Sequence, residues 1–471
     1  MSAFSIRDAP FGQLCRLALS PRVFRYPDEQ EGFEYQPAEE TLPEAPTPEE
    51  NSDSTDTNAD VEKAAPVPSP GQSKSGYQTV GWYSDGDPEN PQVWSLAKKT
   101  ITFTQICLLT FAVYCGSAII TPAQPVFVEV FGVGVQGSSL ALSMYVLGYG
   151  LLGGPVLATG GASAADILSF PKIPYGLTFW GCATLAGPAL GPLLSGFSAP
   201  LSSWRWSMYE LLMFCGFTWI LLFFFLPETN ADFILLKRAK RLRKSTGNQS
   251  LRSDSEIKQG NIHFLSLLGG YLTTPFLVTL RDPSVAFINI YTGLIYGIFY
   301  SYFESFPIVY TQIHGFSTGI MGTIFLSVVV ACFFGAGSYL ALVKFHYEPY
   351  TYNNGIGSPE HRLLPGVVAA LIAPCGILIF AWTSRDWISW VVPTIGIVLY
   401  MACVFVITMC IFIYLPISYP RYAASLFAAN SFLRSALACG AIHFSQPLFN
   451  NLAWLTVEPG TYWLEETPGK Y

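Results

Sequence analysis

The sequence predicts an all-α polytopic membrane protein, a helical bundle reduced to about nine transmembrane helices. Of its 471 residues, 51% are hydrophobic and 12% are charged, which is too apolar for an ordinary soluble protein of this size. Nine apolar stretches lie between residues 101 and 446, and each approaches or exceeds the roughly 20 residues that a helix needs to cross a bilayer. Several contain Pro and Gly, which membrane helices tolerate when neighbouring helices satisfy the freed backbone groups.

An acidic segment over residues 1–98 precedes the first span and is predicted to be a disordered cytoplasmic tail. Residues 1–97 hold 17 Asp and Glu against 6 Lys and Arg, although the whole chain has a net charge of −7. The stretch from about 36 to 75 is rich in Pro, Glu, Ser, Thr and Asp, so it cannot bury enough apolar surface to fold. The rest of the chain is a mildly basic membrane body, and nucleic acid is not an expected partner.

The spans fall into two groups on either side of a basic loop over residues 227–283. Four spans form a reduced amino-terminal half, 99–226, and five form a carboxyl-terminal half, 284–446. A polar tail, 447–471, follows the last span. The predicted spans cover residues 101–121, 138–159, 175–197, 207–226, 284–310, 319–343, 364–382, 388–414 and 423–446.

The basic loop determines the predicted orientation, because Lys and Arg gather in the cytoplasmic loops of membrane proteins. Lys98 and Lys99 abut the first span and place the amino terminus in the cytoplasm. Four spans separate that end from the loop, so both assignments agree. The basic residues of the loop are Lys237, Arg238, Lys240, Arg241, Arg243, Lys244, Arg252, Lys258 and Arg281.

Within the basic loop, the residues from Thr229 to Asp232 resemble a capping box that opens a helix. Phe233, Leu236 and Ala239 would share one face of that helix, with basic residues on the remainder. We predict an amphipathic helix that lies on the inner leaflet, held by apolar contact and by anionic lipid. A solvated linker is the alternative.

Glu304 is the strongest candidate for a functional residue, because a charge in the middle of a membrane costs several kcal/mol and is usually there to bind or carry something. Burial disfavours the charged form of its carboxyl, which would let the group exchange a proton near neutral pH. Tyr296 and Tyr300 precede it by eight and four residues and share its helical face. Such an aromatic wall beside an acid suits amphipathic organic cations. Pro307 is expected to bend the span near the acid.

Arg434 offers the alternative interpretation, in which Glu304 is neutralised in a structural ion pair between two spans. Asn430 lies one turn before this arginine. We favour a proton or substrate role for Glu304 and the structural partner role for Arg434. Weaker candidates, for which we favour packing or surface roles, are Gln105, Glu210, Asp166 and His443. For Glu210 we favour an interfacial pair near the outer surface, close to Arg205 and Trp206.

Several runs together resemble fungal drug–proton antiporters of the major facilitator superfamily, in the branch that includes polyamine and multidrug exporters. The likeness extends along nearly the whole chain, and the order and spacing of the runs make it specific. The runs are NPQVWS at 90–95, ATGGAS at 158–163, WGCATLAGPALGPLLSG at 180–196, LPET at 226–229, YFESFP at 302–307, PEHRL at 359–363, YAAS at 422–425 and FLRS at 432–435.

The resemblance includes the antiporter signature of the fifth helix in such proteins, a Gly-Pro-x-x-Gly pattern. Here it comprises Gly187, Pro188 and Gly191, followed by Pro192 where the family has a second Gly, while Ala183 also replaces a Gly. The resemblance implies a hinge or seal between the two halves. Small residues also allow two helices to approach closely, so tight structural packing is an equal alternative.

Residues 147–155 depart from the family pattern. The front of this run resembles the second helix of the relatives and its back resembles the fourth, so the third helix and its flanking loop are predicted to be absent. After 447–449, a polar tail replaces the expected last span. The fold normally pairs two six-helix halves around a midplane site, so these losses bear on coupling and gating.

Signatures of enzymes are absent from the sequence: it has no Gly-x-Ser-x-Gly, His-Glu-x-x-His, phosphate loop or dinucleotide fingerprint. The ten cysteines and five histidines show no metal-ligand spacing. We therefore predict no enzymatic activity, no catalytic residue and neither a metal nor another cofactor. Without a phosphate loop, the energy source is expected to be a proton gradient.

These features together predict a proton-coupled exporter of small amphipathic organic molecules, such as drugs, polyamines or a secondary metabolite. Its expected partners are the small organic substrate, protons and the lipid bilayer, with the chain a monomer. We expect a multi-pass protein of the cell membrane, with the vacuolar membrane as the alternative. Two other functions stay open: a transport-incompetent interaction partner, which includes the product of a faulty gene model, and an uncoupled facilitator.

Overall fold

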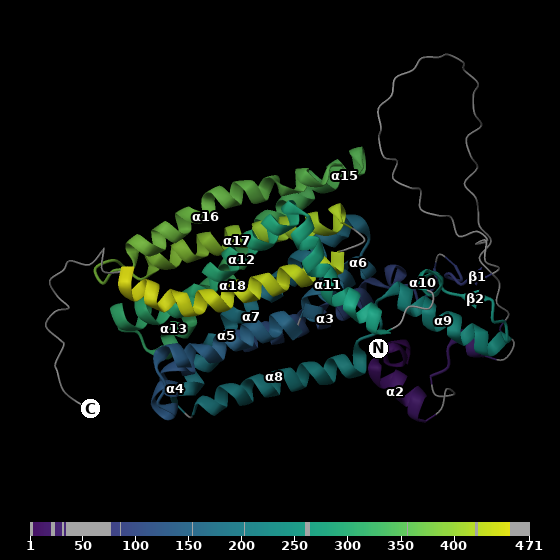
Figure 1. Cartoon of the computed structure of the whole chain (residues 1–471), viewed down its shortest axis with the longest axis horizontal. Helices are drawn as coiled ribbons and strands as arrows, with labels where there is room; N and C mark the ends of the chain where they lie inside the picture. The colour runs from purple at the N-terminus through teal and green to yellow at the C-terminus, as the bar shows by residue number, and fades with distance from the viewer. Residues whose placement is uncertain are drawn as a thin grey trace, which may run out of the picture. The chain divides into compact units, whose positions relative to one another are not determined.

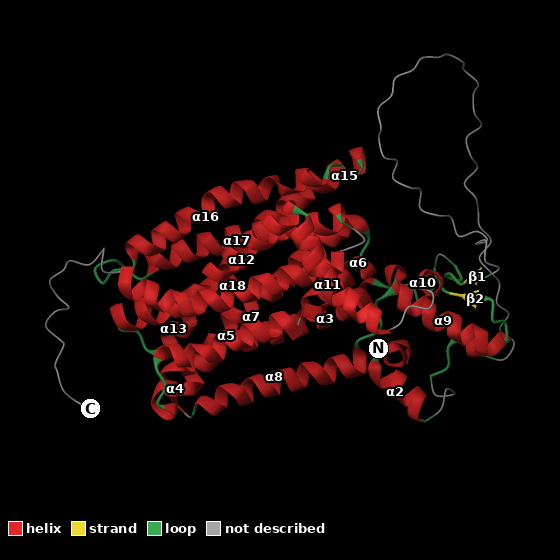
Figure 2. Cartoon of the chain, viewed as in Figure 1, coloured by secondary structure: helices red, strands yellow, loops and turns green. Residues whose placement is uncertain are grey.

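The computed structural model describes residues 3–19, 24–30, 33, 77–84, 86–152, 154–201, 203–259, 264–355, 357–419 and 423–452. The described chain is almost entirely helical, and its strands are a two-residue parallel pair, β1 (Gln78–Thr79) and β2 (Leu251–Arg252) (Figure 2). It divides into two compact units. The bundle unit takes its residues from 1–12, 96–227 and 263–471, and the tail–loop unit takes its residues from 13–95 and 228–262.

The bundle unit confirms the predicted all-α membrane fold. Among the described residues, eight helical stretches are long and apolar enough to cross a membrane. Its helices are α3 (Leu96–Ala118), α4 (Gln124–Phe131), α5 (Val135–Leu152), α6 (Gly154–Ile167), α7 (Ile173–Leu201), α8 (Trp204–Phe225), α11 (Phe264–Arg281), α12 (Pro283–Phe306), α13 (Thr318–Ile324), α14 (Leu326–Leu342), α15 (Glu348–Asn354), α16 (Leu364–Thr383), α17 (Val391–Ser418) and α18 (Ala423–Leu452).

Three predicted boundaries differ from the observed ones. The predicted span over 138–159 is divided between α5 and α6, neither of which alone meets the length and hydropathy of a span. The predicted loop over 227–283 contains the apolar helix α11, which packs against α12 and α18. This helix has 18 residues and Pro275 inside it, so its apolar run falls short of a full span. Finally, α18 continues to Leu452, beyond the predicted start of the polar tail.

Helix α18 connects the two halves of the bundle. It packs lengthwise against α12 of its own half and against α5 and α6 of the amino-terminal half (Figure 1). Helix α7 of the amino-terminal half packs against α3 on one side and against α13 and α14 of the other half. The buried core therefore runs through α3, α7, α12, α17 and α18.

The glycine motif on α7 lies where these helices approach most closely. A Cβ added to Gly191 would lie 2.7 Å from the backbone oxygen of Cys115 on α3, and Gly187 meets the same helix just as closely. The backbone oxygen of Pro192 lies 2.6 Å from the Cβ position of Gly322 on α13. The motif thus packs against both halves, which is the placement that a seal between them requires.

The tail–loop unit is built around α9 (Ala231–Thr246) of the basic loop. The side chain of Asn230 caps its first turn by accepting a hydrogen bond from the Phe233 amide, so the cap is one residue later than the predicted Thr229. Gly247, at φ 71°, ends the helix in the left-handed conformation that glycine adopts without strain. The unit also contains α10 (Asp254–Gln259); the short amino-terminal helices are α1 (Ala3–Asp8) and α2 (Pro10–Ala18).

The acidic tail binds α9, which corrects two expectations. The apolar side chains of Ala239 and Leu242 pack against Val80 of the tail and Leu251 of β2, so this part of the helix faces protein and not lipid. The tail was predicted to be disordered over 1–98, but its described residues 77–84 and 86–95 are folded. The predicted disorder over 36–75 lies outside the described residues.

A buried ion-pair network holds the tail to α9. Arg238 is fully buried, and its Nη1 and Nη2 lie 2.7 and 3.1 Å from the two carboxylate oxygens of Asp87. Its Nη2 is also 3.2 Å from Glu89, while the neighbouring Arg241 pairs with Asp28 and Glu89. Burial opposes ionisation of Asp87, but hydrogen bonds from Arg238 and from backbone amides hold the pKa of this carboxyl below its usual value. The pair therefore stays charged at neutral pH.

Gly191→Ala is expected to destabilise the bundle by about 1–3 kcal/mol, because the new methyl group meets the backbone of α3 and forces two packed helices apart. Gly216→Ala is the matched control, since a Cβ there meets nothing within 4 Å. The measurement is the apparent melting temperature of the purified full-length protein in detergent. Equal melting temperatures for the two variants would contradict the tight contact between α7 and α3.

Arg238→Met is expected to unfold the contact between the tail and α9, because removing one partner of a buried ion pair costs about 3–5 kcal/mol. Lys240→Met, at an exposed position of the same helix, is the control and should leave the contact intact. Amide hydrogen exchange of the backbone hydrogen bonds between β1 and β2 reports the outcome. Retained protection in Arg238→Met would show that the network does not hold the tail.

Candidate functional site

A cluster of buried tyrosines joins the two halves at the centre of the bundle. Helix α12 places Tyr296 and Tyr300 one turn apart, as predicted from their spacing. The hydroxyl of Tyr149 on α5 lies 2.6 Å from that of Tyr296 and 3.4 Å from that of Tyr300. The Tyr300 hydroxyl is also 2.8 Å from Ser117 Oγ on α3. Three helices thus meet through hydrogen-bonded hydroxyl groups.

Arg434 projects from α18 into this aromatic cluster and is only 4% exposed. Its Nη2 donates to the hydroxyl of Tyr114 at 3.3 Å. Its guanidinium carbon lies 4.6 Å from the centre of the Tyr296 ring and 5.8 Å from that of Phe412. The Nε atom is buried and has no hydrogen-bond partner, and no carboxylate among the described residues forms a salt bridge with this side chain.

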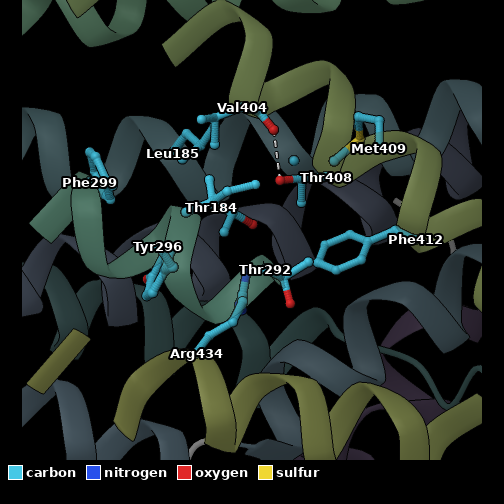
Figure 3. Close-up of a pocket in the computed structure, with 12 residues that line it drawn as sticks. Thr184, Leu185, Thr292, Tyr296, Phe299, Val404, Thr408, Met409, Phe412 and Arg434 are labelled. Atoms are coloured by element: carbon cyan, nitrogen blue, oxygen red, sulfur yellow. Dashed lines mark hydrogen bonds between the residues drawn. The ribbon is translucent and has the colours of Figure 1, made fainter. Parts of the chain in front are cut away.

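A small enclosed cavity lies beside Arg434, with room for about 20 Å³, the space of about one water molecule. Figure 3 shows Arg434 rising from α18 between Tyr296 and Phe412, with the other labelled side chains around the same space. Arg434 is the only charged member of the lining. The lining consists of Gly181, Thr184, Leu185, Thr292, Ile295, Tyr296, Phe299, Val404, Thr408, Met409, Phe412 and Arg434.

Glu304 is also buried, at 4% exposure, but it does not line this cavity. Its Oε1 accepts a hydrogen bond of 3.3 Å from Gln124 at the start of α4, and Ser139 on α5 is its other hydrogen-bonding neighbour. Among the described residues, no cation forms a salt bridge with its carboxylate. Its environment is therefore enclosed and polar without being charged, which suits a carboxyl group that gains and loses a proton.

The ion pair between Glu304 and Arg434, which was the alternative interpretation of the sequence, is not formed. The guanidinium packs over Tyr296, whereas Glu304 lies eight residues further along α12, which corresponds to about 12 Å at 1.5 Å per residue. The two charges therefore lie at different levels of the bundle. The sequence revealed each charge but not the level at which α18 presents its arginine.

The chain changes its helical geometry just beyond Glu304. Helix α12 ends at Phe306, and residues Pro307–Ile313 continue it as a π-helix, a wider turn that is frequent at functional sites. Pro307 was expected to bend the span here. The structure shows a widening of the helix from Pro307, and the bend stays a prediction.

Asn430 takes part in a hydrogen-bond network and does not line the cavity. Its Nδ2 donates to Asn289 Oδ1 at 3.0 Å and to Thr292 Oγ1 at 2.6 Å. Asn289 in turn donates to Thr279 Oγ1 at 3.1 Å, so the network ties α18 to α12 and α11. This arrangement fixes the rotation of α18 and thereby the direction of Arg434.

The weaker candidates are scattered. His443 Nε2 lies 2.8 Å from Ser143 Oγ on α5, which fits a packing role. Gln105 is buried, and its Oε1 has no hydrogen-bond partner. Glu210 was expected to pair with Arg205 near the surface, but no salt bridge joins these two described residues.

Sequence reasoning missed four residues that complete the two sites, namely Tyr114, Gln124, Tyr149 and Phe412. None is unusual in an apolar span, and each acquires its role only by facing a residue on another helix. The one available signal was local: Tyr149 lies in the run over 147–155 that resembles joined helices.

Comparisons with known proteins agree with this architecture. Residues 149–442 match the sequence profile of the Major Facilitator Superfamily. The chain is 37% identical to the MFS-type transporter pyvG of Aspergillus violaceofuscus, covering 79% of this chain and 78% of the relative. It is 32% identical to the transporter mfs1 of Schizosaccharomyces pombe, covering 85% of each chain. Fluconazole resistance protein 1 of Saccharomyces cerevisiae is also 32% identical, covering 86% of this chain and 81% of the relative.

Asn430→Ala is expected to lower stability by about 1–3 kcal/mol, because Asn289 and Thr292 lose a buried hydrogen-bond partner. Ser301→Ala, which removes a hydroxyl bonded only within its own helix, should have little effect. The apparent melting temperature in detergent measures both. A loss of ligand binding without a loss of stability would instead assign Asn430 to the substrate site.

Proposed function

Because the chain belongs to the Major Facilitator Superfamily, we propose that it is a proton-coupled transporter that exports small amphipathic organic molecules. Its relatives support this proposal by their names, which include a fluconazole resistance protein, a cycloheximide resistance protein and an efflux pump. Drugs, polyamines and a secondary metabolite are the substrate classes considered. The proposal involves no enzymatic step and no cofactor, with a proton gradient as the source of energy.

The cavity beside Arg434 is the proposed substrate site. It lies where α7 of the amino-terminal half meets α12, α17 and α18 of the other half, which is the position of the midplane site in such folds. Its small volume corresponds to a closed state, and the site would open when the halves rock apart. Gly187, Pro188, Gly191 and Pro192 on α7 are the proposed seal, because this segment packs against both halves.

Glu304 is the proposed proton carrier, and this assignment rests on its burial without a cation. A buried carboxyl that lacks an ion pair is most stable when protonated, so it takes up a proton unless solvent or a changed conformation stabilises the charge. Opening one side of the bundle to water would release that proton. Alternation between a closed, protonated state and an open, ionised state is the minimum required to couple transport to a proton gradient.

We further propose a monomer in the cell membrane with a cytoplasmic amino terminus, the vacuolar membrane being the alternative. The charge of the described tail–loop unit supports this orientation, because α9 concentrates Lys and Arg between two groups of spans.

A second candidate function is a transport-incompetent membrane protein. The observation that favours it is that α5 ends at Leu152 and α6 begins at Gly154, where the third helix of the relatives is predicted to be missing. Sequencing the transcript across the codons for Gly148 to Gly154 would decide between a shortened protein and a faulty gene model.

Glu304→Gln is expected to abolish the component of substrate flux that depends on a pH gradient, because glutamine preserves the shape of the side chain but cannot be protonated and deprotonated near neutral pH. The measurement is flux of a panel of amphipathic dyes in proteoliposomes, with and without an imposed gradient. Glu129→Gln, at an exposed position on α4, is the matched control. Gradient-driven flux that persists in Glu304→Gln would reject this residue as the proton carrier, and gradient-insensitive flux in the natural protein would indicate an uncoupled facilitator.

A further inference from the structure

We propose that the central cavity binds substrates through an anionic group, with Arg434 as the residue that receives a carboxylate or a similar oxyanion. This inference rests on the proposed function and specifies its substrate class. It departs from the expectation of organic cations, which was based on an aromatic wall beside Glu304.

The first reason is that no carboxylate among the described residues pairs with the charge of Arg434. A guanidinium group stays protonated at every physiological pH, so burial cannot neutralise it as it can a carboxyl or an amine. Arg434 is 4% exposed and has one neutral hydrogen-bond partner, the hydroxyl of Tyr114. Its Nε is left without any partner. An oxyanion with two oxygens would satisfy this unused donor and the charge together.

The second reason is the contrast with Arg238 in the same chain. That side chain is also buried, yet it has Asp87 in a two-pronged contact, Glu89 and a backbone oxygen as acceptors. The protein therefore provides a set of carboxylate acceptors where a buried arginine serves structure, although the Nε of Arg238, like that of Arg434, has no hydrogen-bond partner among the described residues. Arg434 has no such set among the described residues, and it lines a cavity instead.

The third reason is that the aromatic rings no longer favour a cation. The guanidinium of Arg434 already lies over the Tyr296 ring and near the Phe412 ring, so an organic cation would meet a fixed positive charge in front of these faces. Glu304 lies about two turns away along α12 and does not offset that charge. Of the three substrate classes considered, polyamines are thus disfavoured in this cavity.

The other residues that line the cavity indicate the chemistry of the part of the ligand that lies beyond its anionic group. Leu185, Phe299 and Met409 present apolar and aromatic surface, and Thr184 adds a hydroxyl. That hydroxyl bonds to the backbone of its own helix. The cavity holds about one water molecule in this state, so the ligand enters when the two halves part. A flat or compact apolar body that carries one carboxylate would then match this combination of a single fixed charge and apolar walls.

The test uses three probes with the same aromatic body: 1-naphthaleneacetate, 1-naphthaleneacetamide and the 1-naphthylethylammonium ion. Binding to the full-length protein in lipid nanodiscs is measured at one low chloride concentration, in a buffer without carboxylate, sulfate or phosphate, so that competing anions are scarce and equal for all three probes. The natural protein should bind the carboxylate about tenfold or more tightly than the amide, and the ammonium most weakly. In Arg434→Gln the affinity for the carboxylate should fall to that for the amide, and Arg434→Lys should restore part of the preference.

Arg205→Gln, at an exposed position on α8, is the control and should retain the preference for the carboxylate. Unchanged affinity for the amide shows that the Arg434→Gln variant is folded. If the variant does not fold, the order in which the natural protein binds the three probes decides whether the proposal holds. Equal binding of all three, binding of none, or a carboxylate preference that survives in Arg434→Gln would overturn the proposal. Gradient-driven dye flux is measured separately: its absence would reject the proposed transport, whereas the order of the three probes tests the anion site alone.

Discussion

A buried guanidinium group stays charged, whereas a buried carboxyl group can become neutral by taking up a proton. This difference determines the roles that we propose for the two charged residues at the centre of the bundle. Arg434 and Glu304 are both enclosed, and neither has an oppositely charged partner among the described residues. The acid can become neutral by taking a proton, so its isolation suits proton exchange. The arginine must be compensated from outside, so its isolation suits an anionic ligand. Arg434, on α18, packs against Tyr296, whereas Glu304 lies about two turns further along α12, so the two charges do not cancel each other.

The surrounding packing holds these two groups in place. Asn430 fixes α18 to α12 through Asn289 and Thr292, and the tyrosine hydroxyls connect α12 to α5. In the tail–loop unit the buried charges are paired, since Arg238 and Arg241 of α9 are neutralised by the acidic tail. The same residue type therefore serves to fold one unit and, in our proposal, to bind substrate in the other.

The sequence was sufficient for features that depend on one segment at a time. Hydropathy and length located most spans, and spacing placed Tyr296 and Tyr300 on one face. It failed where two distant segments meet. To decide whether Glu304 pairs with Arg434 required the relative height of two helices, and the folding of the tail depends on Asp87 meeting a residue 151 positions away. The sequence did not predict helix α11, because its length of 18 residues and its internal Pro275 fall short of what a full membrane span is expected to show.

The most direct test of the central claim is the infrared spectrum of 1-naphthaleneacetate, labelled with carbon-13 at its carboxylate, when bound to the full-length protein. A carboxylate that exchanges water for a guanidinium changes its hydrogen bonding and therefore its stretching frequency. We predict a carboxylate band displaced from its position in water, with the displacement lost in Arg434→Gln. A band at the same position in the natural protein and in the variant would contradict an anion site at Arg434.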